Sequence, residues 1–369
     1  MSTPKMTRVA AALKGSGMDA LVLLPGPNLY YTLGINQMLR KRPIVYVVFP
    51  DETLAASLPV LEVPDFRTKY AEAEVISWTD AEGPEAAAKR LGGLILDRSR
   101  TRTPRVAAEY FTLRLFERGL LLPGLGGIDF EPAEGILDSL RMFKDPEDVE
   151  AMPQACRIAE ESLEQVMKRF RPGMTEREIA NALKIEMQRL GTEELPKEPV
   201  VSSGPRTAFP HTKTSDRPVN KGEALMIDTG ARYHGYCSDI TRTFFVGPPP
   251  AGYVEIYMLE ASVVQRVLKE VRAGVTLSSL DETAHRMIDD AGYGKYFPHR
   301  VGHGLGIEGH EVPSVVTGNS MLTRPGLTFT VEPGIYLPEL GGARIEENVV
   351  VSPDGVDVLT SYPRELRAL

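Results

Sequence analysis

The segment EALMIDTGARYHGYCSDITRTFFV, residues 223–246, joins two apolar runs and carries an isolated acid at the inner end of each. The run ALMID ends in Asp228, and the run SDITRTFFV begins with Asp239. The turn residues between them, GARYHG, predict a β-hairpin that places both carboxylates at one end of a sheet. Burying an acid at a strand end is costly unless it is paired or bound to a metal, so the pair indicates a cation site. A plain turn-forming role for the two aspartates is the alternative.

Two later strand-like segments supply further acids. In GLTFTVEPGIYLP, residues 326–338, Glu332 ends an apolar run just before Pro-Gly. In GGARIEENVVVSPDG, Arg344 and Glu346 are two positions apart, so a strand would turn both to the same face. Glu347 would then face the opposite way, and only Glu346 of the two neighbouring acids is expected to line a site.

Histidines are concentrated in the segment FPHRVGHGLGIEGHE, which holds His299, His303 and His310 of the six in the chain. A fourth, His211, lies in AFPHTKT. A single histidine is usually structural, but one imidazole beside two Asp and two Glu forms an oxygen-rich ligand set. Such a set suits two neighbouring divalent ions, Mn, Co or Zn, held by bridging carboxylates. One carboxylate-rich zinc site is the alternative, although it leaves two acids unexplained.

Composition narrows the function classes. The chain has 369 residues, 25% of them charged and 42% apolar, and a formal net charge of −8, which disfavours a nucleic-acid partner. The sequence has no apolar run of membrane-spanning length, and its N-terminal apolar run is too short for a signal peptide. Cys156 and Cys237, the two cysteines, form no disulfide framework and no thiol zinc site. We expect a cytoplasmic protein that binds neither membrane nor nucleic acid.

Alternating helical and strand-like patterns predict a small α/β domain over residues 1–140 and a second domain over residues 141–369. In the first domain we expect strands at DALVLLPG, RPIVYVVFP, AEVISW and GGLILDR. The second begins with a long amphipathic helix, for which Asp145 and Pro146 are a suitable N-cap and first-turn pair.

The second domain contains a weak internal repeat. The segment RPGMTEREIANALKIEMQRLG (171–191) aligns without gaps on RAGVTLSSLDETAHRMIDDAG (272–292). Each copy predicts a turn, a threonine N-cap and a helix that ends at glycine. The few identities could arise by chance. A true duplication would give two similar α/β halves with a site between them.

Taken together, these motifs resemble the pita-bread metallopeptidases, the family of methionine aminopeptidase, aminopeptidase P, prolidase and creatinase. The family's pattern is an Asp pair, a His in GHGxG and two Glu in late strands, and the matching positions are Asp228, Asp239, His303, Glu332 and Glu346. The resemblance implies an α/β (α+β) chain: a C-terminal pita-bread domain with pseudo-twofold halves, preceded by a smaller creatinase-like α/β domain. It also implies two divalent metal ions per chain, with Mn expected first and Co or Zn as alternatives.

Within that family, the motifs HRVGHGLG, ARIEENV and SSGPRTAFPH are similar to those of the Xaa-Pro branch. Methionine aminopeptidase does not usually carry counterparts of His299 and Arg344, and creatinase lacks the metal-binding acids. The resemblance implies catalytic roles for His211, His310 and Glu332, in addition to the metal-ligand role of Glu332, and substrate-binding roles for His299 and Arg344.

The expected activity is that of a prolidase, an Xaa-Pro dipeptidase; the alternative is aminopeptidase P, which acts on longer Xaa-Pro peptides. A prolidase must recognise the free carboxylate of proline, and Arg40, Lys41 and Arg42 could supply a cation for it in the homodimer that the resemblance implies. A solvated loop is the alternative for these three residues. An inactive adaptor that kept the fold is disfavoured by the complete ligand set.

Overall fold

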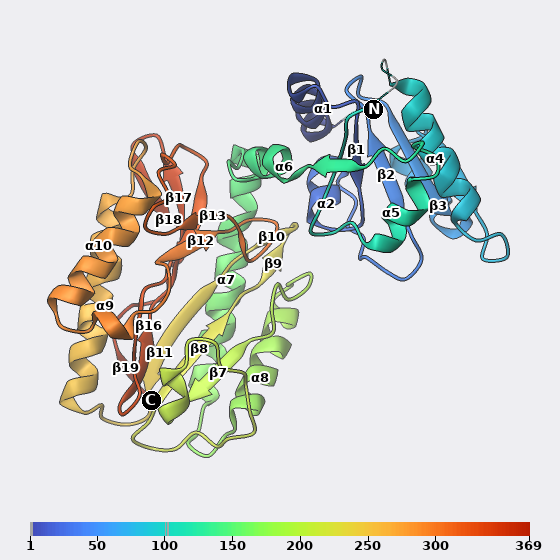
Figure 1. Ribbon diagram of the computed structural model, residues 1–369. Coiled ribbons are helices and arrows are strands. Elements are labelled where there is room, and N and C mark those ends of the chain that lie inside the picture. The colour runs from blue at the N-terminus through green and yellow to red at the C-terminus, as the bar shows by residue number, and fades with distance from the viewer. Residues whose placement is uncertain (1–2, 100, 102) are drawn as a thin grey trace. The chain divides into compact units, whose positions relative to one another are not determined.

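The computed structural model describes residues 3–99, 101 and 103–369. The chain divides into two compact units, Met1–Arg141 and Met142–Leu369, coloured blue to green and green to red in Figure 1. We retain the boundary between residues 140 and 141 as a proposal for where the functional domains divide. None of the helices among the described residues is long and apolar enough to cross a membrane.

The first unit is built on a mixed six-stranded sheet in the order β4-β3-β2-β1-β5-β6. Short apolar runs rich in β-branched residues form its central strands, which are fully buried. The strands are β1 (Ala20–Leu23), β2 (Val45–Val48), β3 (Leu54–Pro59), β4 (Glu74–Trp78), β5 (Val106–Ala108) and β6 (Phe130–Pro132). The helices are α1 (Pro4–Ser16), α2 (Pro27–Leu33), α3 (Val63–Lys69), α4 (Glu85–Arg98), α5 (Leu115–Leu121) and α6 (Glu134–Arg141), with a 3-10 turn, η1, at Val60–Glu62.

One predicted strand of this unit is wrong. The run GGLILDR, residues 92–98, forms the second half of helix α4, which begins at Glu85. A short buried apolar run has no periodicity that separates strand from helix, and here the preceding EAAAKR favours the helix. Leu91 and Ile95 of this helix are buried in one core cluster with Val22 and Val47 of the sheet.

The second unit holds two main sheets, ordered β19-β11-β8-β7 and β13-β12-β14-β17-β18, and two small hairpins, β9/β10 and β15/β16. The strands of the first sheet are β7 (Val200–Ser203), β8 (Ala224–Thr229), β11 (Ile240–Phe245) and β19 (Arg367–Ala368). The strands of the second are β12 (Gly302–Gly304), β13 (Glu311–Val315), β14 (Thr328–Val331), β17 (Glu347–Ser352) and β18 (Gly355–Val358). The small hairpins are β9 (Arg232–Tyr233) with β10 (Tyr236–Cys237), and β15 (Gly334–Leu337) with β16 (Gly341–Arg344).

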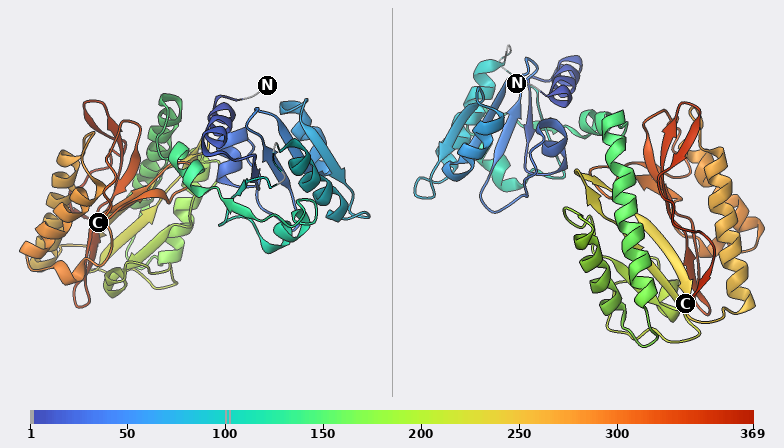
Figure 2. Two further views of the ribbon diagram at one scale, coloured as in Figure 1. Left: turned by 45° about the horizontal axis from the view of Figure 1, so that its top comes forward. Right: turned by 180° about the vertical axis from the view of Figure 1, so that it is seen from behind.

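Two helix pairs cover these sheets from opposite sides, as the views of Figures 1 and 2 agree. The pairs are α7 (Pro146–Arg169) with α8 (Glu176–Arg189), and α9 (Ala251–Glu270) with α10 (Leu277–Asp290). Two 3-10 turns, η2 (Gly204–Ala208) and η3 (Gly294–Tyr296), complete the unit. Each helix pair shares a buried apolar cluster with its own strands.

The internal repeat predicted from the sequence is visible in this arrangement. Thr175 caps α8 and Thr276 caps α10, each accepting a hydrogen bond from the backbone three residues on. Each threonine also forms an isolated β-bridge, to Pro218 in the first half and to Leu322 in the second. The chain is therefore a mixed α/β fold whose second unit consists of two pseudo-equivalent halves, as the sequence predicts.

Candidate metal centre

The predicted hairpin of residues 223–246 sets the position of the two aspartates. β8 and β11 pair antiparallel, with Asp228 opposite Thr241, and Asp239 directly precedes β11. β9 and β10 fill the turn between them. This pairing places both acids at the same end of the first sheet, where Asp239 is buried and Asp228 is partly exposed.

The second sheet brings the other three predicted ligands to this place. His303 lies in β12, Glu332 follows β14, and Glu346 directly precedes β17. Three overlapping groups of ligand atoms each lie within 4.8 Å of one another: Asp228, Asp239 and Glu346; His303, Glu332 and Glu346; and Asp239, His303 and His310. The structure thus assembles all five positions predicted to hold metal, and adds His310 beside them.

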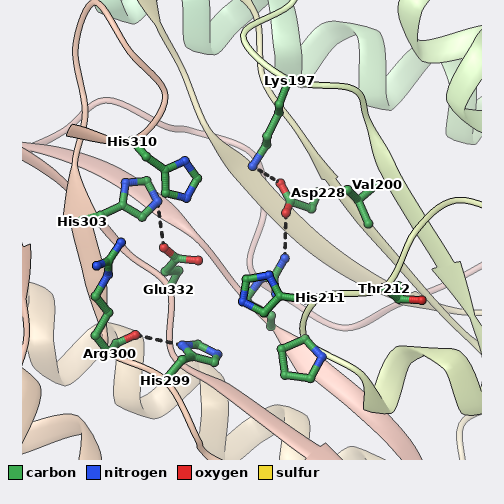
Figure 3. A pocket seen from close by; sticks show the side chains of 12 residues that line it. Lys197, Val200, His211, Thr212, Asp228, His299, Arg300, His303, His310 and Glu332 are labelled. Carbon is green, nitrogen blue, oxygen red and sulfur yellow. Dashed lines mark hydrogen bonds and ion pairs between the residues drawn. The ribbon is translucent and has the colours of Figure 1, made fainter. Parts of the chain in front are cut away.

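A pocket of about 570 Å³ opens onto these groups (Figure 3). His211, His299, His310 and Arg344, the remaining residues expected to act on the substrate, all line it. His211 and His310 are exposed at its mouth, whereas His303 is buried. The full lining is Lys197, Val200, Pro210, His211, Thr212, Asp228, His299, Arg300, His303, His310, Glu332 and Arg344.

The carboxylates fit a divalent-metal centre because some of their buried oxygens lack hydrogen bonds. Asp239 Oδ1, Asp228 Oδ1 and Glu346 Oε1 are buried without a hydrogen-bond partner. The two aspartate oxygens do lie 2.5 Å from Lys197 Nζ, as ion pairs outside hydrogen-bond geometry. Glu346 Oε1 has no such ion pair among the described residues, and leaving a carboxylate oxygen buried and unpaired costs about 1–3 kcal/mol, which a bound cation would offset.

The remaining atoms of these acids are held in place by neighbouring side chains. Thr241 donates to Glu346 Oε2 at 2.7 Å, and Thr330 donates to Glu332 Oε1 at 3.0 Å. Asn348 fixes the backbone of Asp239: it accepts from the Asp239 N–H at 2.9 Å and donates to its carbonyl. Glu346 and Glu332 therefore each have one carboxylate oxygen oriented by a threonine, which is the role of the groups that surround the ligands of a metal.

His303 is oriented by its backbone. Its Nδ1 lies 2.9 Å from Gly304 O, so Nδ1 carries the hydrogen and Nε2 faces the acids. Burial opposes a charged imidazole, but Glu332 Oε1, 3.0 Å from Nε2, raises the pKa of His303 above its ordinary value. The His303 ring stacks on His310, with centroids 3.7 Å apart. Burial and the neighbouring His303 lower the pKa of His310 to about 4.

The two aspartates have opposite shifts. Burial raises the pKa of Asp239 to about 6, with Asp228 adding to it. Burial also opposes ionisation of Asp228, but Lys197 and Arg344 outweigh it and lower the pKa of that carboxyl. Burial, and then the charges of Asp239 and Glu332, raise the pKa of Glu346 well above its ordinary value. Burial, together with neighbouring negative charge, thus opposes ionisation of Asp239 and Glu346, and a bound cation would favour their charged forms.

Two residues of the site were missed by sequence reasoning, Lys197 and Tyr336. Lys197 stands in the loop before β7, where nothing in its neighbours distinguishes it from a solvated lysine. The Tyr336 hydroxyl, in β15, accepts from Arg344 Nη1 at 3.1 Å and lies 2.8 Å from His299 Nε2. It therefore connects the two residues expected to bind the substrate.

Glu347 points away from the centre, as strand alternation predicts. Its carboxylate accepts from Arg242 Nη2 at 2.7 Å and from Arg364 Nε at 2.8 Å. Outside this unit, Arg40, Lys41 and Arg42 are exposed, and Arg42 pairs with Asp80 of its own unit at 2.5 Å.

Comparison with known proteins decides the family. The sequence model of metallopeptidase family M24 matches residues 150–353, and that of the creatinase/prolidase N-terminal domain matches residues 5–143. The chain belongs to metallopeptidase family M24. This M24 metallopeptidase is 32% identical over 362 residues to the provisionally named dipeptidase YkvY of Bacillus subtilis, covering 98% of this chain and 99% of that one.

Solved structures resemble this M24 metallopeptidase over nearly its whole length. A prolidase from Thermococcus sibiricus has a TM-score of 0.93 at 31% identity, covering 99% of this chain and 98% of its own. An Xaa-Pro dipeptidase from Bacillus anthracis has a TM-score of 0.89 at 29% identity, covering 99% of both chains. An X-Pro aminopeptidase from Thermotoga maritima has a TM-score of 0.86 at 30% identity, also covering 99% of both.

Proposed function

We propose that this M24 metallopeptidase is an Xaa-Pro dipeptidase, a prolidase, that hydrolyses the bond before proline with two divalent metal ions. The observation that carries the proposal is one pocket lined by Asp228, His303 and Glu332 of the ligand set together with His211, His299, His310 and Arg344, with Asp239 and Glu346 in the same ligand groups. The likeness to a prolidase and an Xaa-Pro dipeptidase supports it. Aminopeptidase P activity on longer peptides is the second candidate, favoured by the likeness to an X-Pro aminopeptidase.

Asp228, Asp239, His303, Glu332 and Glu346 would hold the ions. Divalent ions at such a centre supply an acidified water nucleophile and polarise the scissile carbonyl. Mn is the metal we propose first, with Co and Zn as alternatives, because carboxylate oxygens with one imidazole suit these ions. Glu332 would carry the proton, because its carboxylate lines the pocket at the end of β14.

The leaving group, the proline nitrogen, is the atom that must receive this proton. The nitrogen of an Xaa-Pro bond carries no hydrogen, so it must gain a proton as the C–N bond breaks. Glu332 would accept the proton of the attacking water and deliver it to the proline nitrogen. His211 and His310, at the pocket mouth, would donate N–H groups to the oxyanion that forms at the carbonyl.

His299 and Arg344 would position the substrate together with Tyr336. The Arg344 guanidinium is already engaged by Asp228 at 2.8 Å and by Tyr336, so it orders the acids. The free face of His299 lies toward the pocket and would contact the proline side of the substrate.

We further propose a cytoplasmic homodimer. Large apolar side chains are exposed on the first unit, where Phe111 is 95% and Leu115 84% exposed, and such residues mark association surfaces. In a dimer, Arg40 and Lys41 would be available for the proline carboxylate. Light scattering coupled to gel filtration tests the dimer, and a monomer at micromolar concentration would contradict it.

Initial rates with Ala-Pro and Ala-Pro-Ala at equal concentration, with Mn²⁺ added, test the activity. A prolidase cleaves the dipeptide faster, because the free carboxylate is part of what it recognises. Faster cleavage of the tripeptide would establish the second candidate. If neither is cleaved with Mn²⁺, Co²⁺ or Zn²⁺, the Xaa-Pro proposal is wrong.

A further inference from the structure

Lys197 places an ammonium group inside the ligand set. Its Nζ lies 2.5 Å from Asp228 Oδ1 and 2.5 Å from Asp239 Oδ1, and Figure 3 shows it extending toward Asp228. The position follows from the sheet, because β7 pairs with β8 so that Val200 lies opposite Asp228. Lys197 lies three residues before Val200, in the loop that leads into β7 beside the acids.

The two ends of the centre are therefore not equivalent. At one end, Asp228 and Asp239 share the Lys197 ammonium. At the other, His303 Nε2 faces Glu332 and offers a nitrogen ligand. Glu346 and Asp239 each belong to a ligand group with His303 as well as to the group with Asp228, so they are shared between the two ends. An ion entering the His303 end meets ligands, whereas an ion entering the aspartate end meets the positive charge of the Lys197 ammonium.

Formal charges lead to the same asymmetry. The four carboxylates of Asp228, Asp239, Glu332 and Glu346 carry four negative charges, and Lys197 and Arg344 together supply two positive ones. One divalent ion neutralises the remainder. With two ions bound the sum is +2 while Lys197 stays and +1 after it moves away, so the second ion favours its departure, because like charges in contact repel strongly where solvent is excluded.

We propose that Lys197 is an internal cation that competes with one of the two metal ions for the Asp228–Asp239 end of the centre. The first ion binds tightly at the His303 end while Lys197 holds the aspartates. The second binds more weakly, because it must displace the ammonium. This inference rests on the metal centre of the proposed function.

The lysine has the properties such a competitor needs. A charged ammonium has no lone pair, so it cannot ligate an ion and must leave when one arrives. Its flexible stem is 25% exposed and lines the pocket, which gives the ammonium a way out toward solvent. In the displaced position it would face the substrate, so occupancy of the second metal position and the charge of the pocket are linked.

Equilibrium dialysis of the metal-stripped full chain against Mn²⁺, with elemental analysis, tests the proposal. We expect two dissociation constants at least about 100-fold apart for the natural chain, given the size of such charge interactions. Lys197→Met should tighten the second constant about tenfold or more and change the first far less. Lys269→Met, on the exposed face of α9, removes the same charge elsewhere and should match the natural chain.

Electron paramagnetic resonance gives a second readout that does not depend on catalysis. At one equivalent of Mn²⁺, the natural chain should show an isolated ion, and Lys197→Met should show a larger share of spin-coupled pairs. Lys197→Gln provides a polar replacement should the methionine variant fold poorly.

Two equal constants that Lys197→Met leaves unchanged would overturn the competition while the metal centre stands. Weaker second-ion binding in both Lys197→Met and Lys197→Gln would also overturn it, because the lysine would then assist the ion. If no variant binds Mn²⁺, the metal centre itself is wrong and this inference falls with it. These binding measurements do not depend on cleavage of Ala-Pro, so they test the inference even if the proposed activity is wrong.

Discussion

Arg344 Nη2 donates a hydrogen bond to Asp228 Oδ2 at 2.8 Å, while the same guanidinium donates to Tyr336 through Nη1. One oxygen of Asp228 is therefore fixed, and the other faces the centre. The planar fork of arginine reaches both partners at once, which an ammonium cannot do.

Arg344→Lys should weaken metal binding or catalysis about 10–100-fold, the usual effect of disturbing a group that orients a ligand. The charge is kept, so the loss reports geometry. Mn²⁺ affinity and kcat/KM for Ala-Pro measure it, with Arg266→Lys on the exposed face of α9 as the matched control. Wild-type values for both quantities would mean that Arg344 does not order Asp228.

His303 and His310 stack on one another but should differ in function. His303→Ala should bind fewer ions, because it removes the Nε2 ligand that the contact between His303 Nδ1 and Gly304 O orients toward the acids. His310→Ala should keep its ions and lose about 10²–10³ in kcat, the size expected for an oxyanion donor. Ion content and kcat measured on the same samples separate the two. Loss of ions in His310→Ala would make it a ligand instead.

Glu347 and Arg242 form a buried pair, each with 1% of its side chain exposed. Glu347→Gln leaves the guanidinium without a charged partner and should lower the free energy of unfolding by about 3–5 kcal/mol. Asp129→Asn, in the exposed pair with Arg118, should cost under about 1 kcal/mol. Urea unfolding of the metal-stripped chain compares them, and equal losses would refute the distinction.

The pair of Glu223 and Arg217 should make stability depend on pH. Burial opposes ionisation of Glu223, but its hydrogen bonds with Arg217 outweigh that and lower the pKa of the carboxyl. A lowered pKa adds stability above the unfolded pKa of about 4.3, and this is lost as pH falls through the folded pKa.

Glu223→Gln should accordingly cost about 1–2 kcal/mol at pH 7 and progressively less toward pH 3. Urea midpoints of both chains across that range test this, and a gap that stays constant with pH would exclude the ionic contribution. Glu282→Gln, on the outer surface of α10, controls for the loss of one carboxylate.

The sequence allowed the local geometry of the site to be predicted. Apolar runs bounded by turn residues defined the hairpin of Asp228 and Asp239, and strand alternation separated Glu346 from Glu347. These patterns depend only on residues close together in the chain, so they can be recognised without knowledge of the tertiary structure. The error at residues 92–98 has the same origin, since a short apolar run that is buried in a helix looks like a buried strand.

Lys197 and Tyr336 could not be predicted in the same way. Lys197 reaches the centre because β7 pairs with β8, a contact between segments separated by a loop. Tyr336 joins His299 to Arg344 through a β-hairpin whose facing is set by tertiary packing. Long-range pairing of this kind leaves no periodic trace in the sequence around either residue.

The internal repeat has a consequence for how the centre is kept together. Asp228 and Asp239 come from the half that contains α8, capped by Thr175, and His303, Glu332 and Glu346 from the half that contains α10, capped by Thr276. Neither half alone contains all five predicted metal ligands. A bound ion would therefore cross-link the two halves. Its dissociation rate would depend on how often the two halves separate.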